Sequence, residues 1–98
     1  MPGSMPVCTV GHKFVGICQI CGPTQGVMIT GSPERQIEGK EICVTGSIGR
    51  GDCGHQCMAV GQSEVFFIDG LPVVRVGDPV TNGIEGELIE GSDFVTSM

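Results

Sequence analysis

The sequence predicts an all-β fold built from short strands and tight turns. Of its 98 residues, 17 are glycine and 6 are proline, and 40% are hydrophobic. Glycine and proline at this frequency favour turns, and the many β-branched residues between them favour strands over disorder. No stretch combines helical periodicity with capping residues over three turns. We therefore expect a small domain whose few large side chains form a thin core that needs a staple.

A short motif recurs every 30 residues, in Met28–Ser32, Met58–Gln62 and Leu88–Ser92. A repeat of this length is normally one supersecondary unit that buries its apolar face only against its neighbours. We place the repeats at approximately 11–46, 47–77 and 78–98 of a single domain spanning 1–98. The opening residues 1–6 are compatible with a tag or a flexible segment as well as with a native start.

Each repeat is expected to contain a β-hairpin. The clearest has strands Ser63–Ile68 and Pro72–Val76 around the turn Asp69-Gly70-Leu71, and Glu38-Gly39 takes the same part in the first repeat. Asp-Gly between apolar runs is a strong hairpin signal, because glycine adopts the positive φ that these turns require. Three such units predict pseudo-threefold symmetry, which suits a cap on a trimer. The repeat is equally compatible with units that only build a compact fold.

Charge and hydropathy narrow the classes of partner. The formal net charge of −6 argues against nucleic acid or an anionic membrane as the main partner, since both bind basic surfaces. No apolar run resembles a signal peptide or reaches the about 20 residues of a membrane-spanning helix. We therefore expect the chain to be made in the cytoplasm, where thiols stay reduced.

Six cysteines and two histidines supply candidates for the staple. Cys18 and Cys21 form a C-x-x-C, which presents two sulfurs to one tetrahedral ion at metal–sulfur distances of roughly 2.3 Å. Cys53 and His55 alternate on an extended turn, and in a repeat protein their loop lies at the same end as the first. We predict a metal site made of these four residues. Two further candidates are held in reserve, Cys57 and His12.

The remaining cysteines fit a structural role. Cys43 lies mid-strand between Ile42 and Val44, which is typical of a buried core thiol, and we expect the same of Cys8. The acidic residues are scattered at turns and strand positions, where solvation explains them. A closed four-ligand metal site leaves no open coordination position for water. We therefore expect no enzymatic activity.

The second repeat carries a family signature. Pro72-Val73-Val74-Arg75 follows the Asp69-Gly70 turn and precedes Val76-Gly77-Asp78. This order resembles the PAAR-repeat family, which is named for a Pro-Ala-Ala-Arg run between such a turn and a Val-Gly-Asp. The Gly-Ser pairs at 31–32 and 91–92 are similar to the family's Gly-Ser positions, and the resemblance runs from about Val10 to Ser97.

The resemblance implies a short, compact β cone with a metal ion, usually zinc, near its apex. In that family the broad base sits on the blunt end of a trimeric β-helical spike, VgrG-like or a tail spike. Such spikes belong to contractile injection machines: type VI secretion systems, phage tails and related extracellular particles. The implied role here is a tip that sharpens the spike for piercing the target envelope. It would be monomeric alone, bind one per trimer, touch the envelope transiently and leave the cytoplasm on a virion tail or secreted particle.

The chain departs from the family in its metal ligands. The family mostly uses three histidines and one cysteine, whereas this chain has two histidines and a surplus of cysteines. His12 stands where the family often has the Asp of Val-Gly-Asp, which makes it a weaker ligand candidate. The resemblance implies zinc, and iron is also compatible with the residues.

Two rivals remain open from the residues. A small cysteine-rich metal-binding or thiol-redox protein would use Cys18 and Cys21, although a redox C-x-x-C usually opens a helix in an α/β pattern. Disulfides among the six cysteines are compatible with an extracellular final location. A nucleic-acid zinc ribbon is disfavoured, because it spaces its cysteine pairs by about 15–20 residues and is basic.

Overall fold

The computed structural model describes residues 5–92 and 96–97. Residues 1–4 and part of the third predicted repeat, 93–95 and 98, lie outside the described residues. The all-β prediction is confirmed, because the described residues form strands, turns and connecting segments. In this part of the chain no helix is long and apolar enough to cross a membrane.

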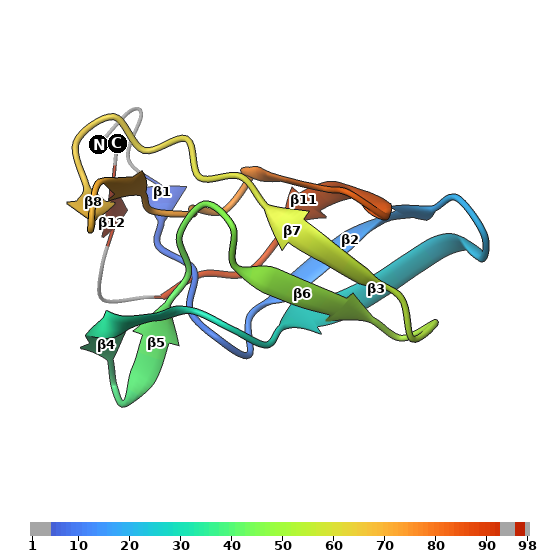
Figure 1. Ribbon diagram of the computed structural model, residues 1–98, viewed down its shortest axis with the longest axis horizontal. Helices are drawn as coiled ribbons and strands as arrows, with labels where there is room; N and C mark the ends of the chain where they lie inside the picture. Colours follow the sequence, from blue (N-terminus) through green and yellow to red (C-terminus); the bar gives the residue numbers. More distant parts are fainter. Residues whose placement is uncertain (1–4, 93–95, 98) are drawn as a thin grey trace.

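A closed six-stranded barrel forms the body of the molecule (Figure 1). Its strands are β2 (Lys13–Cys18), β3 (Gly22–Met28), β6 (Ile48–Gly51), β7 (Gln56–Ala59), β10 (Pro79–Thr81) and β11 (Ile84–Leu88). They pair as antiparallel neighbours in the order β10-β11-β2-β3-β6-β7, and β10 pairs with β7 to close the ring. Closure leaves the barrel without a free strand edge.

The barrel is narrow because glycines let its strands approach closely. Gly16 of β2 pairs with Gly86 of β11, and a Cβ on Gly86 would collide with the carbonyl oxygen of Val15. The interior is filled by apolar side chains and thiols that are buried almost completely. They are Cys8, Phe14, Cys18, Met28, Cys43, Cys57, Ala59, Val74, Val80, Ile84 and Leu88. A core of this composition has few large side chains, as the sequence predicts.

Three two-stranded pairs lie beyond the barrel at one end of the molecule (Figure 1). They are β4 (Ser32–Ile37) with β5 (Lys40–Ile42), β8 (Phe67–Ile68) with β9 (Leu71–Pro72), and β1 (Met5–Pro6) with β12 (Thr96–Ser97). The predicted hairpin turns are confirmed: φ is 53° at Glu38 and 54° at Asp69, each followed by a positive-φ glycine. Of the opening residues 1–6, Met5 and Pro6 form a strand, so these two are structural.

Both predicted strands of the second hairpin are shorter than expected. Ser63–Ile68 is reduced to β8, which begins at Phe67, and Pro72–Val76 does not continue the β8–β9 hairpin, because β9 ends at Pro72. Beyond it the chain changes partner, and Val73 bridges Val44 while Arg75 bridges Val7. The valines were expected to extend the hairpin, and they instead join the segments that meet at the centre of the molecule.

A closed ring of three backbone hydrogen bonds marks that centre. The Cys8 N–H donates to the Val74 carbonyl at 2.9 Å, Val74 donates to Cys43 at 2.9 Å, and Cys43 donates back to Cys8 at 3.0 Å. All three residues are fully buried, which confirms the prediction for the two cysteines. Each of the three residues donates its N–H to one of the others and accepts an N–H from the third. These buried backbone groups are therefore satisfied without water.

Three turns with one hydrogen-bond pattern follow these ring residues, at 9–12, 44–47 and 75–78. In each turn the last side chain accepts the N–H of the first residue: His12 Nδ1 at 2.9 Å, Ser47 Oγ at 3.0 Å and Asp78 Oδ2 at 2.8 Å. The glycine N–H of each turn donates to the carbonyl of the last strand residue of a barrel hairpin, at Met28, Ala59 and Leu88 respectively. Each turn is thereby fastened to one hairpin.

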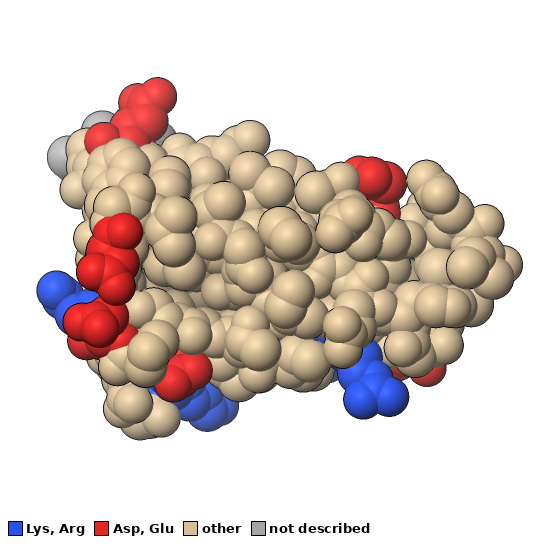
Figure 2. All heavy atoms as spheres, in the orientation of Figure 1, with Lys and Arg blue, Asp and Glu red and all other residues tan. Residues whose placement is uncertain are grey.

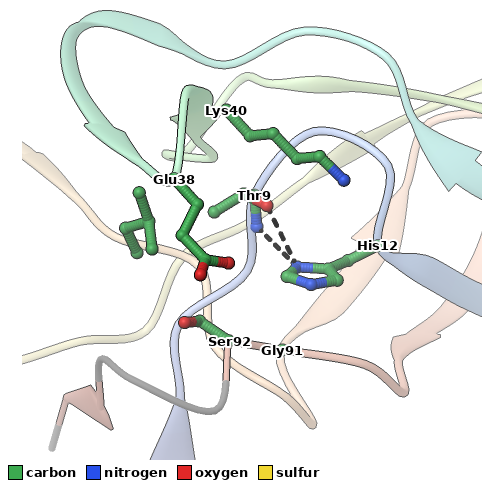
Figure 3. Close-up of a pocket in the computed structure, with 7 residues that line it drawn as sticks. Thr9, His12, Glu38, Lys40, Gly91 and Ser92 are labelled. Carbon is green, nitrogen blue, oxygen red and sulfur yellow. Dashed lines mark hydrogen bonds between the residues drawn. The ribbon is translucent and has the colours of Figure 1, made fainter.

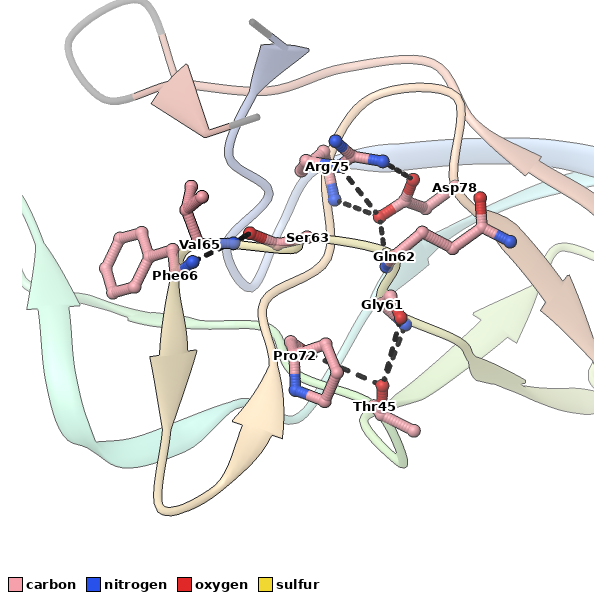
Figure 4. A network of polar contacts seen from close by, with 9 residues as sticks. All are labelled: Thr45, Gly61, Gln62, Ser63, Val65, Phe66, Pro72, Arg75 and Asp78. Atoms are coloured by element: carbon pink, nitrogen blue, oxygen red, sulfur yellow. Dashed lines mark hydrogen bonds and ion pairs between the residues drawn. The ribbon is translucent and has the colours of Figure 1, made fainter. Parts of the chain in front are cut away.

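The Asp78 turn is joined to a neighbouring segment by side-chain contacts (Figure 4). Asp78 is 2% exposed and pairs with the Arg75 guanidinium at 3.1 Å. Its Oδ2 also accepts the Gln62 N–H at 2.9 Å, so one carboxylate joins two chain segments.

The molecule tapers along its longest axis, with extents of 35 × 28 × 23 Å. The two-stranded pairs form the broad end, and the turns of the barrel hairpins form the narrow end (Figure 1). On the face shown in Figure 2, acidic side chains gather at the broad end and the narrow end is largely uncharged.

Candidate metal centre

The four predicted ligands meet at the narrow end. The ligand atoms of Cys18, Cys21, Cys53 and His55 all lie within 4.8 Å of one another. Cys18 ends β2 and Cys21 lies in the β2–β3 turn, whereas Cys53 and His55 lie in the β6–β7 turn. Because β3 pairs with β6, these two turns are neighbours in space although they are far apart in the sequence.

His55 Nδ1 is spaced almost evenly from the three sulfurs. Its distances to Sγ are 3.4 Å for Cys18, 3.3 Å for Cys21 and 3.6 Å for Cys53. A tetrahedral ion with metal–sulfur bonds of about 2.3 Å and metal–nitrogen bonds of about 2.0 Å holds these atoms about 3.5 Å apart. The group therefore has the donor atoms and the spacing to hold one metal ion.

The site favours a thiolate at one of its cysteines. Hydrogen bonds from the His55 backbone, and then from its side chain, lower the pKa of Cys53 to about 6. Loss of hydration, followed by hydrogen bonds and charge repulsion from Cys53 and Cys18, raises the pKa of Cys21 to about 11. The thiolate is the form that binds metal, so an ion would displace the protons that the cluster still shares.

The four residues of the cluster differ in their exposure to solvent. Cys18 is buried in the barrel, Cys53 and His55 are partly buried, and Cys21 is exposed. The Thr24 hydroxyl hydrogen-bonds Cys53 and also lowers its pKa. Sequence reasoning missed Thr24, because no spacing rule points to a supporting hydroxyl on the strand next to a ligand.

The two reserve candidates are elsewhere. Cys57 is 2% exposed inside the barrel, and burial raises the pKa of its thiol to about 11. His12 accepts the Thr9 N–H in its turn and lines a small polar pocket with Glu38, Lys40 and Ser92 (Figure 3). Neither residue belongs to the Cys/His group. His12 accepts the first N–H of its turn, as Asp78 does in the 75–78 turn.

The third barrel hairpin contributes no Cys or His ligand. Its turn between β10 and β11 reads Asn82-Gly83, and the sequence contains neither cysteine nor histidine from Asp78 to Glu87. The Cys/His group therefore draws on two of the three barrel hairpins. No protein-family model matches this chain, and no curated protein sequence matches it.

Proposed function

We propose that this chain is a metal-stabilised, non-enzymatic tip that caps a trimeric β-helical spike with a stoichiometry of one per trimer. The observation that carries the proposal is the closed ring of hydrogen bonds through Cys8, Cys43 and Val74, with its three similarly bonded turns. A monomer with internal threefold order can present one equivalent surface to each subunit of a trimer.

The pairing of the elements supports pseudo-threefold symmetry. Each unit would comprise a turn, a barrel hairpin and a two-stranded pair at the broad end. The first unit holds β2 to β5 and the second β6 to β9, and the third joins β10 and β11 to the β1–β12 pair. In this interpretation the opening strand completes the third repeat, which the sequence shows as shorter than the others.

The broad end has the properties of a docking surface. Val65, Phe67 and Leu71 are 66%, 50% and 41% exposed at the β8–β9 hairpin and the segment before it. The two-stranded pairs also have outer backbone edges, unlike the closed barrel. Exposed apolar side chains beside open strand edges favour strand addition or end-on stacking by a β-rich partner.

The proposed ion is zinc, and its role is mechanical. Three thiolates and one imidazole are a typical structural zinc set, and thiolate ligands favour zinc over harder ions, although iron is compatible. The ion would tie the β2–β3 turn to the β6–β7 turn. Four protein ligands fill a tetrahedron, so no position is left for a reacting water. Its binding free energy, about 10 kcal/mol, would become folding free energy.

We propose that the protein occupies two locations in succession. It would be made in the reducing cytoplasm, where free thiols load metal, and then be carried on a tail or secreted particle to a target envelope. The largely uncharged narrow end on the face of Figure 2 supports this order, since a leading end with few charges loses little hydration on contact with an envelope.

The test is the stoichiometry of binding to a purified trimeric β-helical spike, measured by native mass spectrometry. We expect one chain per trimer. Phe67→Asp at the broad end should weaken binding at least tenfold, whereas Ile20→Asp, at an 80% exposed residue of the narrow end, should not. Three chains per trimer, or equal effects of the two substitutions, would refute the proposal.

A thiol-redox protein is the second candidate, and one observation favours it. Cys53 has a lowered pKa of about 6 and lies beside the exposed Cys21. Rapid alkylation of these thiols in the folded, metal-loaded protein would support the redox function. Protection from alkylation by the metal would support the structural one.

A further inference from the structure

Two of the three clustered thiols lie in turns, and the third lies in a strand. Cys18 lies on β2, where it pairs with Gly22 of β3 and with Ile84 of β11, and it is 2% exposed. Cys21 and Cys53 lie in the turns of two different hairpins, outside the strands. The three sulfur atoms lie within 4.8 Å of one another, and the Cys21 and Cys53 side chains are hydrogen-bonded to each other, so these two turn thiols already face one another.

We propose that Cys21 and Cys53 form a disulfide when the ion is lost under oxidising conditions, so that a covalent bond replaces the ion as the link between the two turns. The inference rests on the proposed metal-binding role, because it gives the same two turns a second means of attachment. Cys18 would remain a free, buried thiol.

The other cysteines do not compete for this bond. The Cys8 thiol donates to the Glu90 carbonyl at 3.1 Å, and the Cys43 thiol donates to the Thr30 carbonyl at 3.5 Å. Cys57 is enclosed in the barrel. Burial raises the pKa of Cys43 to about 12, and it raises the pKa of Cys8 still further. Thiols in this state are poor nucleophiles.

The oxidant is a small-molecule disulfide, such as oxidised glutathione. The Cys53 thiolate attacks one sulfur of the oxidant, and the other sulfur leaves as a thiol after taking a proton. Cys21, once it has lost its proton, then attacks the Cys53 sulfur of this mixed disulfide, and the second small thiol leaves. Two protein thiols are thus oxidised to one disulfide while one small disulfide is reduced to two thiols, and the metal ion passes to solvent or to a chelator.

The consequence is a tip whose narrow end stays joined in either environment. In a reducing compartment the ion joins the turns, and outside the cell the disulfide does so where metal is scarce. A crosslink between positions 21 and 53 restricts the unfolded chain over that whole interval, so its stabilisation should be substantial.

The experiment compares the metal-free protein before and after treatment with oxidised glutathione. Trypsin would release peptides 14–35 and 51–75, which carry the two candidate cysteines. We expect these peptides to be joined, with fragment ions that place the bond at Cys21 and Cys53. The melting temperature of the oxidised, metal-free protein should exceed that of the reduced, metal-free protein by at least about 10 °C. A bond to Cys18 or Cys57, or no bond, would overturn the inference.

Three variants separate this inference from the metal proposal. Cys18→Ser should lose zinc binding but still gain melting temperature on oxidation, and Cys21→Ser should lose both. Cys57→Ala is the matched control, since it removes a barrel thiol outside the group and should retain both. If zinc leaves the melting temperature of the unsubstituted protein and of all three variants unchanged, the metal proposal is refuted and the disulfide proposal is not. If the melting temperature of Cys18→Ser does not rise on oxidation, the disulfide proposal is refuted and the metal proposal is not.

Discussion

The centre and the narrow end of this molecule both bring together segments that are distant in the sequence, but they use different interactions to do so. At the centre the joints are backbone hydrogen bonds between fully buried residues, closed on themselves through Cys8, Cys43 and Val74. At the narrow end the two turns are joined by side chains, three thiols and an imidazole, with one thiol exposed. The centre is therefore self-sufficient, whereas the narrow end depends on what its side chains bind.

The largest expected effect comes from removing the metal. A chelator that competes with thiolates should lower the melting temperature by at least about 10 °C, because metal binding free energy is lost from the folded state. Hydrogen exchange should accelerate in the β2–β3 and β6–β7 turns, while the amides of Cys8, Cys43 and Val74 stay protected. An unchanged melting temperature, with no metal found by elemental analysis, would show that no metal ion stabilises the narrow end.

The next effect tests the centre. Asp78→Ala should destabilise the fold by about 3–5 kcal/mol, because it leaves the Arg75 guanidinium unpaired and two backbone N–H groups without an acceptor. Urea denaturation measures this change. Ser47→Ala is the matched variant, since the Ser47 side chain accepts only one N–H in its own turn. It should cost about 1 kcal/mol. Equal losses of unfolding free energy in the two variants would mean that the bonds of Asp78 to Arg75 and Gln62 add no stability beyond closing the turn.

The narrow end was the more predictable region, because its signals are local. The C-x-x-C spacing identifies two candidate ligands, and the predicted repeat put the Cys53–His55 loop at the same end as Cys18 and Cys21, where the structure has it. The Glu38-Gly39 and Asp69-Gly70 turns were predictable for the same reason, since the positive φ that each turn needs is supplied by its own two residues. Zinc or iron, and the trimeric partner, remain predictions that only binding experiments test.

The centre was less predictable, because its contacts join segments that share no local pattern. Pairing of β1 with β12 joins opposite ends of the chain, and nothing near Met5 or Pro6 indicates it. The valines after Pro72 are apolar enough for a strand, but the pattern does not say which segment they meet. The three turn-closing acceptors differ chemically, as His12, Ser47 and Asp78, so alignment of the repeats did not identify them as equivalent.

The smallest expected effect asks whether these three acceptors are interchangeable. His12→Ala should destabilise the fold by about 1 kcal/mol, because the Thr9 N–H loses its 2.9 Å acceptor. His12→Asp should recover most of that loss in urea denaturation at neutral pH, since a carboxylate already accepts the matching N–H of Arg75. His12→Asp should also leave metal content unchanged, because His12 lies outside the Cys/His group. A loss of metal in either variant would instead link the turn to the narrow end, and the two regions would no longer be independent.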